Sequence, residues 1–99
     1  MDIYQISSYI YNNTGSAIDT EVVNEICPDD TIEVSKRDSR QFLAIGFDPT
    51  DDGFILGTLW YRYENGDKEA VEEGLCWHID GEEDYGTLDD ICEYARKEL

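Results

Sequence analysis

The feature that most constrains the fold of this chain is the pair Asn65-Gly66, which lies between two long runs of strand-forming residues, 54–64 and 67–79. Asn-Gly suits the positive φ angles of a tight type I′ turn, and such a pair between two runs of this kind predicts an antiparallel β-hairpin. A turn of fixed length also fixes which residues of the two strands face each other. The pair therefore predicts a register as well as a hairpin.

Placing Glu64 opposite Asp67 gathers large apolar side chains on one face of the hairpin. The pairs on that face are Phe54 with Trp77, Leu56 with Leu75 and Trp60 with Val71. Facing apolar pairs stabilise a sheet and mark its buried side, so we expect this face to be the core. The reverse face, with Leu59 and Tyr61, is mixed and is expected to take a helix or a partner.

Two further strands are expected before the hairpin, at 31–36 and 41–48, which makes a four-stranded antiparallel meander. A helix over residues 3–12 is expected to precede them, because Asp2 and Gln5 form a capping-box pattern and isoleucines then recur at helical spacing. A strand is the alternative for 3–12, since Tyr9-Ile10-Tyr11 has high β propensity.

Residues 17–27 are expected to form a second, short helix. Ser16 and Asp19 repeat the capping pattern, Ile18, Val22 and Ile26 recur every four residues, and a proline follows at position 28. The first two segments would then form a helical hairpin.

The end of the chain predicts the clearest helix. Thr87 and Asp90 suit its first turn, and Arg96 and Lys97 suit its last. Its apolar stripe comprises Leu88, Ile91, Cys92, Ala95 and Leu99. The expected fold is therefore a single α+β domain over residues 1–99: an N-terminal helical hairpin, a four-stranded antiparallel meander sheet and a C-terminal helix packed on the sheet.

The net charge of the chain limits the classes of partner that it can bind. Twenty-four Asp and Glu against seven Lys and Arg give a net charge of −17. This makes direct contact with nucleic acid or an anionic membrane unfavourable over most of the surface. Three cysteines without paired spacing, no basic and apolar leader and no run of eighteen apolar residues favour a cytoplasmic protein, in the host cytoplasm if a phage encodes it.

The pattern of three residues indicates a possible metal-binding or redox site. Cys76, His78 and Asp80 alternate along one strand and would point to one face, as metal ligands or a nucleophile beside a base do. Zinc sites, however, draw on ligand pairs such as Cys-x-x-Cys, and a Cys-His catalytic pair comes from facing elements. We therefore favour a partly buried cysteine beside a surface histidine.

Calcium loops and other enzyme motifs are incomplete or missing. The segment from Asp48 has the glycine of an EF-hand loop but Leu59 at its closing position, and the segment from Asp80 lacks both the glycine and the closing glutamate. No glycine-rich phosphate loop, Gly-x-Ser-x-Gly or His-Glu-x-x-His occurs. The expectation is a protein without cofactor, metal or catalytic activity.

Exposed carboxylates with a few aromatic rings are typical of a protein-binding surface. The segment HIDGEEDYGTLDD, residues 78–90, and the turn after the second strand concentrate them. The candidate contact residues are Asp80, Glu82, Glu83, Asp84, Tyr85, Asp89, Asp90, Glu93, Asp48, Asp51 and Asp52. Tyr4, Tyr11, Tyr63 and Tyr85 are expected off the core. The basic turn KRDSR at 36–40 implies a charge asymmetry, and we favour a solubilising role for it over partner contact or self-association.

The leading hypothesis is a non-enzymatic inhibitor that occupies the basic groove of a nucleic-acid-handling protein as a DNA or RNA mimic. By analogy of size and charge, its partner would be a CRISPR effector, a restriction enzyme or a nuclease toxin, with phage anti-defence ahead of toxin immunity. Two alternatives stay open: a small metal-binding or redox protein using Cys76, His78 and Asp80, and a salt-adapted housekeeping domain. A homodimer is compatible with each.

Overall fold

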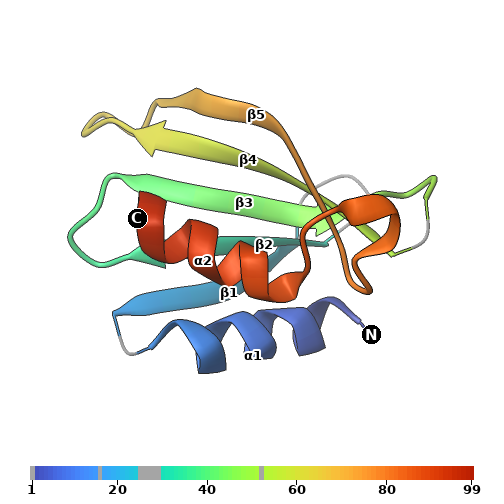
Figure 1. Ribbon diagram of the computed structural model, residues 1–99. Coiled ribbons are helices and arrows are strands. Elements are labelled where there is room, and N and C mark those ends of the chain that lie inside the picture. The colour runs from blue at the N-terminus through green and yellow to red at the C-terminus, as the bar shows by residue number, and fades with distance from the viewer. Residues whose placement is uncertain (1, 16, 25–29, 52) are drawn as a thin grey trace.

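The computed structural model describes residues 2–15, 17–24, 30–51 and 53–99. Its elements follow in the order α1 (Ile3–Thr14), β1 (Ile18–Asn24), β2 (Asp30–Lys36), β3 (Gln41–Phe47), β4 (Phe54–Arg62), β5 (Lys68–His78), a 3₁₀ turn η1 (Glu82–Asp84) and α2 (Leu88–Glu98). In the described residues the strands form one antiparallel five-stranded sheet in the order β1-β2-β3-β4-β5 (Figure 1).

The α+β class, the meander and the terminal helix are confirmed, and two details of the expected fold are wrong. The segment from Ile18 to Asn24 is strand β1, not a helix, so α1 has no helical-hairpin partner and the sheet gains a fifth strand. Residues 25–27 of the expected second helix lie outside the described residues. The first helix is confirmed over its strand alternative.

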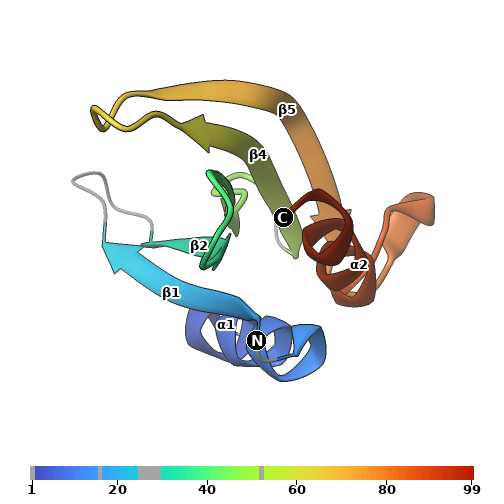
Figure 2. The ribbon, with the colours of Figure 1, turned by 90° about the vertical axis from the view of Figure 1, so that its left-hand side faces the viewer.

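Both helices cover the same face of the curved sheet, with α1 beside β1 and α2 across its middle (Figures 1 and 2). The core between them draws Ile6 and Ile10 from α1 and Ile91 and Ala95 from α2. The sheet contributes chiefly Ile32, Val34, Leu43, Ile45, Ile55 and Trp77. Removing these side chains from water is the main favourable term for folding.

Helix α1 starts at a complete capping box. The Asp2 carboxylate accepts a hydrogen bond from the Gln5 N–H at 2.8 Å, and the Gln5 side chain accepts one from the Asp2 N–H at 2.8 Å. Further along, the Ser7 hydroxyl lies 3.0 Å from the Thr20 hydroxyl, which places α1 on β1. One partly buried polar pair thus positions the helix over the strand that follows it.

The predicted register of the β4–β5 hairpin is wrong over most of its length. Phe54 pairs with His78 instead of Trp77, and Arg62 pairs with Lys68. Two register shifts, between Gly57 and Leu59 and between Leu59 and Trp60, separate these stretches. Because a one-residue slip moves a side chain to the opposite face, the expected faces of β4 are exchanged.

The core face of β4 therefore carries Ile55 and Leu59, which are buried, and Leu56 points outward with 44% of its surface exposed. On β5 the expected core residues Leu75 and Trp77 do face the helices, whereas the third, Val71, is 52% exposed and is not part of the core. On the outer face, Arg62 lies over the Phe42 ring at 4.3 Å and Lys68 over the Trp60 ring at 4.6 Å.

Within the described residues, no helix is long and apolar enough to span a membrane.

Candidate functional site

The candidate contact residues gather at one end of the molecule, which we call the acidic end. It is formed by the β3–β4 turn, the segment from His78 to Gly86 with η1, and the first turn of α2 (Figure 1). Backbone bonds join these pieces: the Ile79 N–H donates to the Gly53 carbonyl at 3.0 Å, and the His78 N–H donates to the Gly86 carbonyl at 2.8 Å. The described carboxylates of this end are those of Asp48, Asp51, Asp80, Glu82, Asp84, Asp89 and Asp90.

Four of these carboxylates have structural roles, and Glu82 is one of them because its oxygen lies 3.2 Å from the Nε2 of the buried His78. Asp48 accepts bonds from the Thr50 N–H at 2.9 Å and the Thr50 hydroxyl at 2.8 Å, and these bonds lower the pKa of Asp48. Asp90 accepts from the Thr87 N–H at 2.7 Å at the start of α2. Asp89 accepts from the Tyr9 hydroxyl of α1, a bond that raises the pKa of Tyr9. These groups hold turns and helices in place as well as carrying charge.

The remaining carboxylates are more available for a partner. Asp51, Asp80 and Asp84 are exposed, and in the described residues their carboxylates accept no hydrogen bond. Tyr85 is 41% exposed and its ring meets Phe54 edge to face at 5.1 Å. Glu93 is exposed one turn further along α2. A fixed aromatic ring among free carboxylates is an arrangement suited to protein contact.

Asp52 and the side chain of Glu83 lie outside the described residues.

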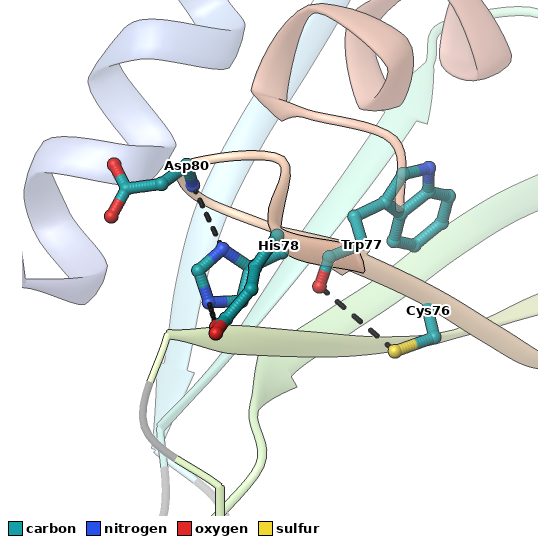
Figure 3. A network of polar contacts seen from close by, with 5 residues as sticks. Cys76, Trp77, His78 and Asp80 are labelled. Atoms are coloured by element: carbon teal, nitrogen blue, oxygen red, sulfur yellow. Dashed lines mark hydrogen bonds and ion pairs between the residues drawn. The ribbon is translucent and has the colours of Figure 1, made fainter. Parts of the chain in front are cut away.

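His78 is buried, with 5% of its surface exposed, and is not the surface residue expected from the sequence. Its Nδ1 accepts a hydrogen bond from the Asp80 N–H at 3.0 Å, and its Nε2 lies 3.2 Å from a Glu82 carboxylate oxygen (Figure 3). An accepting Nδ1 places the ring proton on Nε2, directed at Glu82. The imidazole therefore links the end of β5 to η1.

Cys76 and His78 do share a face of β5, but the trio does not form one centre. The Cys76 Sγ lies 3.9 Å from the Trp77 carbonyl oxygen, both His78 nitrogens have other partners, and the Asp80 carboxylate points away from the ring (Figure 3). Burial, helped by the charges of Asp48 and Asp51, raises the pKa of the Cys76 thiol. A raised pKa lowers the thiolate fraction on which nucleophilic and redox cysteines depend.

Metal binding gains no support from the described geometry. Among the residues that the structure describes, no three His, Cys, Asp or Glu side chains are placed to hold an ion. The two incomplete calcium loops are instead closed by internal contacts, with the Asp48 N–H bonded to the Phe54 carbonyl at 2.9 Å in the first and the Tyr85 N–H bonded to the Glu82 carbonyl at 3.1 Å in the second.

The opposite end of the molecule holds all seven Lys and Arg residues. They lie on the β2–β3 turn, at the β4–β5 hairpin end and in the last turn of α2, whose Glu98 carbonyl accepts a 2.9 Å bond from the Gln41 side chain (Figure 1). Two of these bases pair with carboxylates, Arg40 with Glu64 at 3.0 Å and Arg62 with Glu33 at 3.2 Å. The charge asymmetry expected from KRDSR thus extends over the whole chain.

The sequence reasoning missed a second surface feature at this hairpin end. A hollow of about 670 Å³ is lined by Gln41, Tyr61, Tyr63, Glu69, Ala70 and Val71. The prediction that Tyr4, Tyr11, Tyr63 and Tyr85 lie off the core is confirmed. The alternation of Tyr61 and Tyr63 was a signal for a shared aromatic face, but only the true register shows which residues complete it.

Comparison of the chain with protein-family models, with curated proteins and with solved structures finds no match in any of the three.

Proposed function

We propose that this protein is a non-enzymatic inhibitor whose acidic end binds the basic groove of a nucleic-acid-handling protein in place of DNA or RNA. The observation that carries the proposal is the absence of bases from the acidic end, since all seven Lys and Arg lie at the other end, among further carboxylates such as Glu64 and Glu69. Seven described carboxylates gather at the end that carries no Lys or Arg, in a chain of net charge −17. A groove lined with Lys and Arg to meet phosphates attracts such a surface and is blocked by it.

The rigidity of the acidic end supports the same proposal. The β3–β4 turn, η1 and the start of α2 are tied by backbone bonds and by the buried His78. Carboxylates carried by a hydrogen-bonded backbone lose less entropy on binding than carboxylates of a flexible tail. Electrostatic steering would speed the encounter, and Tyr85 would supply the apolar contact that slows dissociation.

We place the protein in the cytoplasm, with a CRISPR effector or a restriction enzyme as the first partners to test and a nuclease toxin as the next. A redox or metal function has less support, because neither His78 nitrogen contacts Cys76 and the thiol pKa is raised.

The test compares two triple variants that change net charge equally. Asp51→Lys, Asp80→Lys and Asp84→Lys reverse free carboxylates of the acidic end, and Asp19→Lys, Glu21→Lys and Asp38→Lys reverse exposed ones elsewhere. Binding to purified candidate nucleases and effectors is measured by biolayer interferometry. We expect the first triple to lose binding roughly 100-fold or more and the second to lose less than about tenfold.

Salt and competition complete this test. Wild-type affinity is expected to fall steeply as salt is raised, and duplex DNA should compete for the partner. Equal losses in both triples, or binding insensitive to salt, would exclude mimicry by the acidic end.

A further inference from the structure

The hollow lined by Tyr61, Tyr63, Glu69, Val71 and their neighbours, hereafter the tyrosine hollow, lies on the helix-facing side of the β4–β5 hairpin. Tyr61 is the cross-strand partner of both Gln41 and Glu69, and the Gln41 side chain reaches the Glu98 carbonyl of α2. The hairpin end extends away from α2 in both views (Figures 1 and 2). The helix therefore ends where the hollow begins.

The rings of the tyrosine hollow are held in place by each other and by a carboxylate. Tyr61 and Tyr63 meet at 5.0 Å between centroids with their planes 64° apart. The Tyr63 hydroxyl donates to the Glu69 Oε2 at 2.6 Å, and the other Glu69 oxygen makes no hydrogen bond within the described residues. Val71 and Tyr63 remain 52% and 45% exposed. Such a site offers aromatic faces and a free carboxylate oxygen together.

On the outer face of the same hairpin, by contrast, aromatic rings are covered by cations of the chain. There, Arg62 covers Phe42 and Lys68 covers Trp60. In the part of the chain that the structure describes, no Lys or Arg lies over Tyr61 or Tyr63. The rings on the outer face are thus covered by cations of the chain itself, whereas the Tyr61 and Tyr63 rings on the helix-facing side are open to a cation of a partner.

The charges next to the hollow leave room for a positive occupant although the bases of the chain lie at this end, because Arg40 and Arg62 are paired with Glu64 and Glu33. The hollow adjoins the C-terminal end of α2, where the helix dipole is negative, and the chain as a whole carries −17. The last turn of α2 has two bases: Arg96 donates to the Asn13 carbonyl at the end of α1, and Lys97 is exposed and is not among the residues that line the hollow. A cation entering the hollow meets a carboxylate without displacing a resident base.

We infer that the tyrosine hollow receives an arginine side chain of the basic partner, stacked on the tyrosine rings and hydrogen-bonded to Glu69. This inference rests on the proposed function and adds a second contact, at the end opposite the acidic residues. Arginine is favoured over lysine because its planar guanidinium stacks on a ring while its N–H groups bind a carboxylate in the same plane.

The test is an NMR titration of the full chain with N-acetylarginine methylamide at constant ionic strength, with the neutral citrulline analogue as the matched ligand. We expect the Tyr61 and Tyr63 ring signals to shift saturably with the arginine compound and not with the citrulline one. Tyr63→Leu should weaken the interaction at least about threefold, Tyr63→Phe should retain it, and Tyr11→Leu on α1 should leave it unchanged.

Three results would overturn the inference: no saturable shift, equal shifts with both ligands, or shifts confined to the acidic end and Tyr85. These outcomes are separate from those of the proposed function. If Tyr63→Leu leaves partner binding intact and the acidic-end triple abolishes it, the inhibitor proposal stands and the arginine site fails.

Discussion

At the scale of single residues, the contact between Gly53 and His78 joins the β3–β4 turn to the end of β5. Gly53 has φ +86°, and a Cβ at this position would lie 2.7 Å from His78 Nε2. The imidazole cannot retreat easily, because it is buried and its Nδ1 is bonded to the Asp80 N–H. The position therefore requires glycine for its backbone angle and for space.

Gly53→Ala is expected to lower the free energy of unfolding by roughly 2–4 kcal/mol, from a left-handed backbone penalty plus overpacking against the ring. Gly66→Ala is the matched control, since Gly66 has φ +92° and open space around its Cβ position. Gly66→Ala should lower the free energy of unfolding only by the left-handed backbone penalty, roughly 1–2 kcal/mol. Urea unfolding of both variants checks this, and equal losses would show that the His78 contact contributes nothing.

At the scale of elements, the spacing of apolar residues explains which predictions succeeded. Ile3, Ile6 and Ile10 of α1 are three and four apart, a spacing that only a helix brings to one face. Ile18 and Val22 are four apart, which fits a helix but also places both on one face of a strand. The capping pattern at Ser16 favoured the wrong alternative, and the Thr20 contact with Ser7, which the sequence does not reveal, accompanies the strand.

Register was less predictable than topology. The Asn65-Gly66 turn indicated the correct hairpin, but its length differs from the expected one: the Tyr63 N–H donates to the Asp67 carbonyl, and Arg62 pairs with Lys68. Register shifts near Leu59 then move the pairing again. Such bulges depend on how both faces pack, so a periodic pattern alone does not locate them.

The capping box of α1 gives a prediction at this scale. Asp2→Ala removes the acceptor of the Gln5 N–H and should cost about 1 kcal/mol, because α1 covers one edge of the core. Asp2→Asn keeps a good cap and should stay within about 0.5 kcal/mol of wild type. Guanidinium unfolding measures both, and a loss as large for Asn as for Ala would mean that charge, not capping, is responsible.

At the scale of the whole molecule, composition predicted the acidic surface but not its geometry. The candidate carboxylates do cluster, because antiparallel strands and α2 bring the β3–β4 turn and residues 78–90 to one end. The tyrosine hollow was not predicted, since it needs the true register and the end point of α2. The sign of the surface charge can thus be predicted from the sequence, whereas contacts between segments that are distant in the chain cannot.

The carboxylates concentrated at one end predict that the melting temperature depends on salt. In dilute buffer, with a Debye length of roughly 30 Å at 10 mM, the carboxylates of the acidic end repel one another across most of that end. The buried core is expected to keep the chain folded there, with a cooperative melt whose midpoint rises by roughly a few degrees as NaCl approaches 150 mM.

The neutralised variant Asp51→Asn, Asp80→Asn and Asp84→Asn should melt higher than wild type in dilute buffer and respond less to salt, because the repulsion is already reduced. Asp84 has φ +65°, a conformation that asparagine also tolerates, so its substitution adds little backbone strain. Calorimetry or circular dichroism measures each midpoint. A wild-type chain that unfolds in dilute buffer would instead support salt adaptation, and an unchanged salt slope in the variant would place the repulsion elsewhere.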